Sequence, residues 1–77
     1  MPRNIDYYIK LPWRVLIEPE IQDDGAVLYV AFYPEFDGVL GAGVTPEAAL
    51  ADLRVAFHCA IEAMIQEGYP IPEPASV

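Results

Sequence analysis

The side chains of this sequence that could perform hydrolytic chemistry are few and poorly grouped. Glu18 and Glu20 flank a proline, and Asp23 and Asp24 lie together in a predicted turn. A metal-dependent hydrolase needs carboxylates or imidazoles that converge on an ion. The observed spacing is instead typical of solvated charges at a turn and a strand edge. We therefore expect no metal site and no other cofactor.

His58 and Cys59 are the remaining candidates for a general base and a nucleophile. Both fall within a predicted helix, where neighbouring side chains diverge by about 100°. This divergence favours a surface histidine and a small, partly buried thiol over a catalytic pair. The sequence therefore predicts a protein without enzymatic activity. A minimal hydrolase, the alternative, would have to lose its activity on His58→Ala or on removal of a metal.

The charge balance restricts the kinds of partner that this chain can bind. Twelve acidic and four basic side chains give a formal net charge of −8. Such a chain repels a phosphate backbone, so we expect no direct binding of nucleic acid. The same field attracts a basic protein, although acidity can also serve solubility alone.

The length and the composition predict a small domain that associates with other chains. With 77 residues the sequence forms one domain, residues 1–77, which buries only about 60% of its unfolded surface. Its 55% hydrophobic content exceeds the roughly 45–50% of a typical soluble domain. We therefore expect a homo-oligomer, a dimer or a tetramer, that buries the surplus apolar surface.

The sequence also predicts a soluble protein of the reducing cytoplasm. Cys59 has no second cysteine with which to form an internal disulfide, and residues 1–4 lack the apolar stretch of a secretory signal. No run of roughly 18 apolar residues suggests a membrane span.

Residues 13–44 are predicted to form a three-stranded antiparallel sheet. Apolar residues alternate with polar ones from the start of this range to Pro19, which marks an edge or the end of a strand. Residues 22–25 are typical of a turn, and residues 27–33 of a central strand because they are apolar on both faces. Residues 39–43 predict a short third strand that contains glycines.

Residues 45–68 are predicted to form one long helix. Thr45 is of the type that caps a helix at its beginning, and Gly68 is of the type that ends one. Residues 1–12 are interpreted as a lead-in, and residues 69–77 as an extended or loose proline-rich tail. The fold class is therefore α+β, with the helix packed on one face of the sheet. The uncovered face or a sheet edge is the predicted docking surface.

Four short blocks stand at the turns and caps of this predicted fold. They are Tyr7–Trp13, Tyr33–Gly38, Gly43–Leu50 and Gly68–Pro74. In this order they resemble the amino-terminal domain of the HicB antitoxin family. The resemblance implies a partial ribonuclease H-like fold, β-β-β-α-β, without the carboxylates that ribonuclease H activity requires.

The resemblance also implies a function. HicB antitoxins bind and cover the active region of HicA, a small basic ribonuclease that cleaves mRNA. Two positions depart tolerably from the family: Asp37 replaces a proline and Val39 replaces a cysteine. The family usually continues into a fourth strand and a DNA-binding domain, whereas this sequence ends near Val77. We therefore expect that this chain does not repress its own operon by DNA binding.

The main hypothesis is thus a HicB-like domain that neutralises a basic HicA-like toxin by direct binding. The candidate steering charges are Glu18, Glu20, Asp23, Asp24 and Glu35. The candidate interface anchors are Tyr29, Tyr33 and Phe36. The alternative hypothesis is a HicB-like homo-oligomer with no toxin partner and a structural or small-ligand-binding role.

Overall fold

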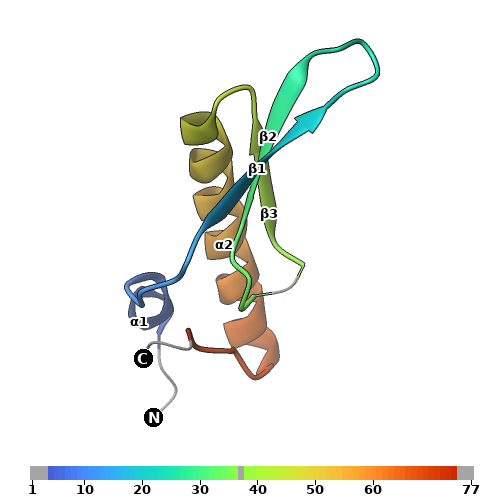
Figure 1. The fold of residues 1–77 in the computed structure, drawn as a ribbon. Helices are drawn as coiled ribbons and strands as arrows, with labels where there is room; N and C mark the ends of the chain where they lie inside the picture. Colours follow the sequence, from blue (N-terminus) through green and yellow to red (C-terminus); the bar gives the residue numbers. More distant parts are fainter. Residues whose placement is uncertain (1–3, 37, 75–77) are drawn as a thin grey trace.

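The computed structural model describes residues 4–36 and 38–74. Asp37 of the turn before the third strand, and the outer ends of the predicted lead-in and tail (1–3 and 75–77), lie outside the described residues. The described part forms an antiparallel sheet with one long helix packed against it, as predicted (Figure 1). Its elements are α1 (Ile5–Ile9), β1 (Leu16–Ile21), β2 (Val27–Phe32), β3 (Leu40–Gly43) and α2 (Pro46–Glu67).

The sheet has the strand order β1-β2-β3, so the predicted central strand is central. β1 and β2 form a hairpin whose turn contains Gly25 at a φ of 88°, a conformation that favours glycine. The Asp24 side chain accepts a hydrogen bond from the Ala26 backbone N–H at 2.9 Å, which stabilises the same turn. The turn prediction for residues 22–25 is therefore confirmed.

β1 begins at Leu16, three residues later than the predicted start at Trp13. If the register of Leu16 with Phe32 continued, Val15 would pair with Tyr33. Tyr33 instead opens a turn, in which its carbonyl accepts a hydrogen bond from the Phe36 N–H at 3.0 Å. β2 therefore ends at Phe32. Residues 13–15, which were predicted to begin the first strand, have no strand residues opposite them with which to pair.

α2 has the predicted caps at both ends. The Thr45 hydroxyl accepts a hydrogen bond from the Ala48 N–H at 3.0 Å, and Pro46 occupies the first turn, where no intrahelical donor is needed. Gly68 ends the helix in the left-handed conformation, with a φ of 73°. The buried positions of α2 recur every four residues, which places them on one face of the helix: Ala49, Leu53, Phe57 and Ile61.

The glycines of β3 allow α2 to lie directly against the strand. A Cβ atom on Gly41 would stand 2.5 Å from the carbonyl oxygen of Ala49 and 2.6 Å from the Cα of Leu53. A Cβ atom on Gly43 would meet the Ala48 side chain at 2.6 Å. Any larger residue at these two positions would therefore push the helix off the sheet.

An aromatic cluster fills the core at the carboxyl half of α2. Phe57 lies at its centre, with its ring 4.8 Å from that of Tyr33 and 5.2 Å from those of Trp13 and Phe36. All three contacts are edge-to-face, the arrangement that aromatic rings prefer. The Trp13 indole N–H also donates to the Tyr8 carbonyl at 2.7 Å, which ties α1 to this cluster.

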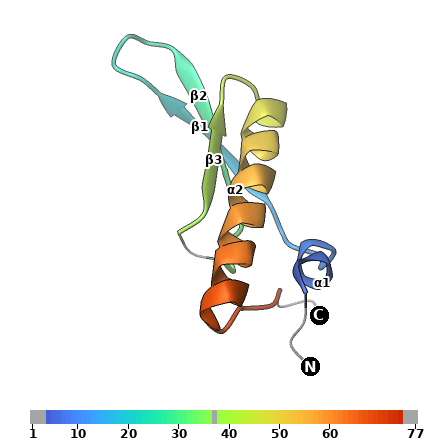
Figure 2. The same cartoon turned by 180° about the vertical axis from the view of Figure 1, so that it is seen from behind.

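The predicted lead-in and tail are more ordered than the sequence indicated. Residues 5–9 form α1, which Asn4 caps by accepting a hydrogen bond from the Tyr7 N–H at 3.1 Å. The tail is extended but not loose. Its Glu73 carboxylate accepts a hydrogen bond from the Tyr7 hydroxyl at 3.1 Å, and Pro74 is buried. The tail therefore turns back after α2 and packs beside α1 (Figure 2).

The β1–β2 hairpin projects beyond the amino-terminal end of α2 (Figures 1 and 2). The molecule is accordingly long, with principal extents of 49 × 25 × 17 Å. α2 packs mainly against β3 and β2 and touches β1 little. The outer half of the hairpin therefore has no helix against it.

Candidate functional site

The register of the sheet divides its side chains into a covered face and an open face. Ala31 and Gly41 are paired residues that lie against α2. Because side chains alternate along a strand, their neighbours point away from α2. We call the side turned away from α2 the open face, and it carries Leu16, Glu18, Glu20, Leu28, Val30, Phe32, Leu40 and Ala42.

The open face is largely apolar and is not used by the core. Leu28, Val30 and Phe32 are half-buried in the middle of the sheet but do not pack against the core cluster. Leu40 on β3 is 60% exposed, and Leu16 on β1 is 42% exposed. Large apolar side chains grouped on one exposed surface are typical of a protein-binding site.

Carboxylates border this apolar surface on the β1 side. Glu18 is paired with Val30 and Glu20 with Leu28, so both acidic side chains stand on the open face next to central apolar residues. Asp23 and Asp24 continue the acidic border in the exposed hairpin turn. Four of the five predicted steering charges therefore lie in one region of the surface.

The free edge of β1 lacks one donor. Gln22 donates to the Ala26 carbonyl at 2.7 Å, which makes this a hydrogen-bonded pair. Such pairs alternate with non-hydrogen-bonded ones along an antiparallel ladder. Pro19 lies three positions before Gln22, so its pair with Tyr29 is a non-hydrogen-bonded one. The Pro19 nitrogen therefore points away from β2, and the proline costs the sheet no hydrogen bond. Of the two alternatives predicted at Pro19, the structure has the edge strand and not the end of a strand, because β1 continues to Ile21.

The predicted anchors Tyr33 and Phe36 lie in the core and not on the surface. Their exposed fractions are 7% and 4%, because both rings pack against Phe57. Tyr29 is half-buried and packs against the same core, on the face that α2 covers. These three aromatic residues therefore stabilise the fold, whereas the exposed apolar surface is formed by other residues.

Glu35, the fifth predicted steering charge, is folded against the body of the protein. Its Oε2 lies 3.6 Å from a guanidinium nitrogen of Arg14, and only 19% of the side chain is exposed. Its Oε1 is buried and has no hydrogen-bond partner. Glu35 is thus an ion-paired residue of the turn and lies apart from Glu18 and Glu20.

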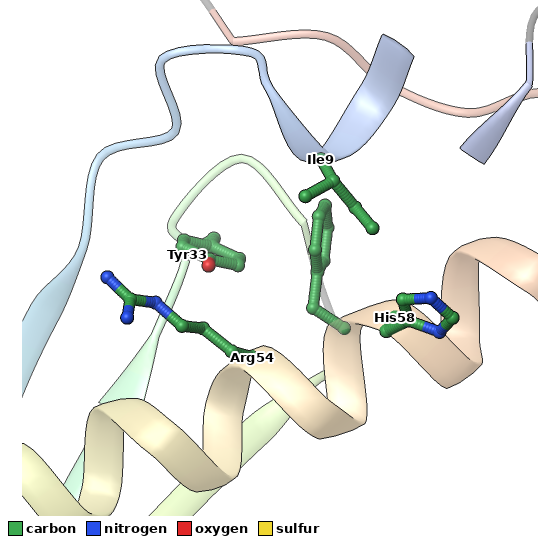
Figure 3. Close-up of a pocket in the computed structure, with 5 residues that line it drawn as sticks. Ile9, Tyr33, Arg54 and His58 are labelled. Carbon is green, nitrogen blue, oxygen red and sulfur yellow. The ribbon is translucent and has the colours of Figure 1, made fainter. Parts of the chain in front are cut away.

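A separate cavity lies between α1 and α2, on the covered side of the sheet (Figure 3). It has a volume of about 250 Å³ and is lined by Ile9, Tyr33, Arg54, Phe57 and His58. Burial raises the pKa of the Tyr33 hydroxyl above its ordinary value of 10.0, and the positive charge of Arg54 partly opposes this rise. The polar groups of the cavity can all donate hydrogen bonds.

The described residues 4–36 and 38–74 contain no group of three or more His, Cys, Asp or Glu side chains that could hold a metal ion. Cys59 is exposed, although the sequence predicted partial burial. It lies two positions from both Phe57 and Ile61, and their side chains point to the sheet while its own points away. Within the same residues no helix combines the length and the apolar character needed to cross a bilayer.

Comparison with known proteins gives no assignment for this chain. No family model matches it, and no curated protein and no solved structure is detectably similar to it. Its surface and its sequence blocks are therefore the basis of any functional inference.

The sequence predicted the acidic half of the candidate surface but not the apolar half. Leu16, Phe32 and Leu40 were not among its candidates, although they share the open face. One signal could have found them. Ala31, Gly41 and Gly43 are small residues that share one face of the sheet, the face against which the helix packs. The large residues on either side of Ala31 in β2, Val30 and Phe32, therefore mark the other face.

Proposed function

We propose that this chain is a non-catalytic protein-binding domain of the HicB antitoxin type, and that its open face binds a small basic ribonuclease toxin. The observation that carries the proposal is an exposed apolar sheet face bordered by Glu18 and Glu20. The four sequence blocks that resemble HicB support the same function, since they stand at the turns and caps of this fold.

The chemistry of the open face suits a basic partner. Apolar contact with Leu16 and Leu40 would supply affinity by excluding water from the centre of the interface. Glu18 and Glu20 would attract lysine and arginine side chains that otherwise bind RNA. A toxin held in this way has its cationic surface covered, so that RNA cannot reach it.

The test is co-purification with the basic protein encoded by the adjacent reading frame. We expect a stoichiometric complex by light scattering after gel filtration, and loss of the partner's ribonuclease activity within it. Absence of a basic protein beside this gene, or absence of a complex with it, would count against the proposal.

Two matched variants test whether the open face is the binding surface. Leu40→Glu places a charge at an apolar position of the open face that is 60% exposed. Val55→Glu does the same on α2, at a position that is 64% exposed. We expect Leu40→Glu to weaken the complex by about 10- to 100-fold, a loss typical of an interface hot spot, and to restore ribonuclease activity. Equal weakening by both variants would contradict the assignment of the surface.

The homo-oligomer remains a second candidate because the projecting hairpin has apolar residues on its other face as well. Ile21 is 79% exposed and Val27 is 42% exposed. Pairing of two β1 edges about Pro19, however, would set Glu18 opposite Glu20 of the other copy, which is unfavourable. Sedimentation of the purified chain without a partner distinguishes a stable homo-oligomer from a monomer that associates only with a toxin.

A further inference from the structure

The cavity between α1 and α2 combines apolar walls with two nitrogen-containing side chains (Figure 3). Phe57 and Ile9 supply apolar surface, and the ring of Tyr33 adds to it. Arg54 and His58 are four residues apart on α2, but Figure 3 shows the Arg54 guanidinium extending towards the side of Tyr33 and the His58 ring extending the opposite way. The cavity therefore has apolar walls and one nitrogen-containing side chain at each side.

The charge of Arg54 has no partner in the described part of the chain. Arg14 forms an ion pair with Glu35, whereas no described residue forms an ion pair or a hydrogen bond with Arg54. An arginine is charged at every physiological pH and presents a planar fork of donors that fits a carboxylate. The chain has a net charge of −8, so an arginine without an ion pair beside a cavity creates a local positive charge in a negative protein.

We propose that this cavity binds a small organic monoanion whose carboxylate pairs with Arg54 and whose apolar body lies against Tyr33 and Phe57. A cavity of roughly 150 Å³ is enough to hold a benzene molecule. The volume of about 250 Å³ therefore accommodates one aromatic ring with a carboxylate. The site lies on the covered side of the sheet and is independent of the open face.

The charge of the whole chain favours a monoanion over a polyphosphate. Arg54 can neutralise one negative charge, and the remaining charges of a nucleotide would face the negative field of the protein. A carboxylate on an apolar body adds contact with the ring of Phe57 without adding further charge. The expected ligand class is thus aromatic or branched aliphatic carboxylates.

Benzoate and benzamide provide a matched pair of probes. They have nearly the same shape, but only benzoate carries a negative charge. A titration followed by amide chemical shifts should show saturable binding of benzoate, with shifts centred on Arg54, Phe57 and His58, and much weaker binding of benzamide. Equal binding of the two probes, or no saturable binding of benzoate, would refute the proposal.

Two arginine variants separate a specific contact from the general field. Arg54→Gln should weaken benzoate binding by about tenfold or more, as expected when a charge-assisted hydrogen bond is lost. Arg14→Gln changes the net charge equally but lies outside the cavity lining, and should change the affinity less than about twofold. Both positions are exposed, and circular dichroism checks that each variant is folded. Similar weakening by the two variants would overturn the proposal.

Discussion

The carboxylate of Asp52 on α2 accepts a hydrogen bond from the backbone N–H of Ala42 on β3 at 2.9 Å. Ala42 is paired with Val30 at a non-hydrogen-bonded position, so its N–H points out of the sheet at the β3 edge. The helix thus satisfies a donor that an edge strand would otherwise offer to another chain.

Asp52→Ala should therefore open the β3 edge at Ala42. A hydrogen bond of this kind contributes about 1 kcal/mol, so the Ala42 amide should exchange its hydrogen about fivefold faster in the variant. Hydrogen exchange followed by NMR measures this directly. Glu62→Ala is the control, because it removes an acidic residue from the exposed side of the same helix and should leave the exchange of Ala42 unchanged.

Gly41→Ala should be the most destabilising of the small substitutions in the sheet. The added Cβ would stand 2.5 Å from the Ala49 carbonyl oxygen, so α2 must move away from β3. We expect a loss of about 3 kcal/mol of unfolding free energy in urea denaturation. The neighbouring Ala42→Val adds more volume on the open face and should cost less than about 1 kcal/mol. Equal losses would mean that the close approach of helix and strand is unimportant.

The stability of the protein should fall at alkaline pH through Tyr33. Burial raises the pKa of its hydroxyl above the ordinary value of 10.0, so the folded chain holds this proton more tightly than the unfolded chain does. The resulting stabilisation is complete below about pH 10, the pKa of the unfolded chain, and is lost as the pH rises through the higher pKa of the folded chain.

Urea midpoints between about pH 8 and pH 11 test this dependence. Tyr33→Phe should reduce the alkaline fall, because it removes the titrating hydroxyl but keeps the ring against Phe57. Tyr69→Phe is the matched control, since Tyr69 is 61% exposed. A fall of the same size in Tyr33→Phe and in the unmodified protein would show that other groups cause it.

Reversal of the charges at Glu18 and Glu20 should slow association with a basic partner. Substitution of both by lysine removes the attraction at the border of the open face, so we expect the association rate to fall about tenfold at low salt. Stopped-flow measurements at several salt concentrations should also show a weaker salt dependence. The pair Glu62→Lys and Glu67→Lys on α2 changes the net charge equally and should have a smaller effect.

The local signals of the sequence predicted the sheet and the long helix well. Thr45 and Gly68 cap α2 where expected, because capping depends on the chemistry of single residues and their immediate neighbours. The short helix α1 was missed, although Asn4 is a capping residue and Asp6 follows in the first turn. A five-residue helix has almost no periodicity, and α1 is held by a tertiary contact with Trp13 that no local signal reveals.

The candidate site was predicted only in part, for a different physical reason. Alternation tells which residues of a strand share a face, but it does not tell which face the helix covers. Tyr29 and Tyr33 were assigned to the exposed surface, yet they share a face with Ala31, where α2 packs. Charged residues were easier to place, since Glu18 and Glu20 must remain solvated whichever face is open.

The projecting tip of the β1–β2 hairpin gives the protein a natural insertion point. Its turn at Asp23 and Asp24 is exposed and lies beyond the end of α2, so that additional residues there would touch neither the helix nor the aromatic cluster. Exposed turns of this kind accept extra sequence at little cost. A fluorophore, an epitope or a short crosslinkable peptide can therefore be carried at this position while the remainder of the fold stays intact.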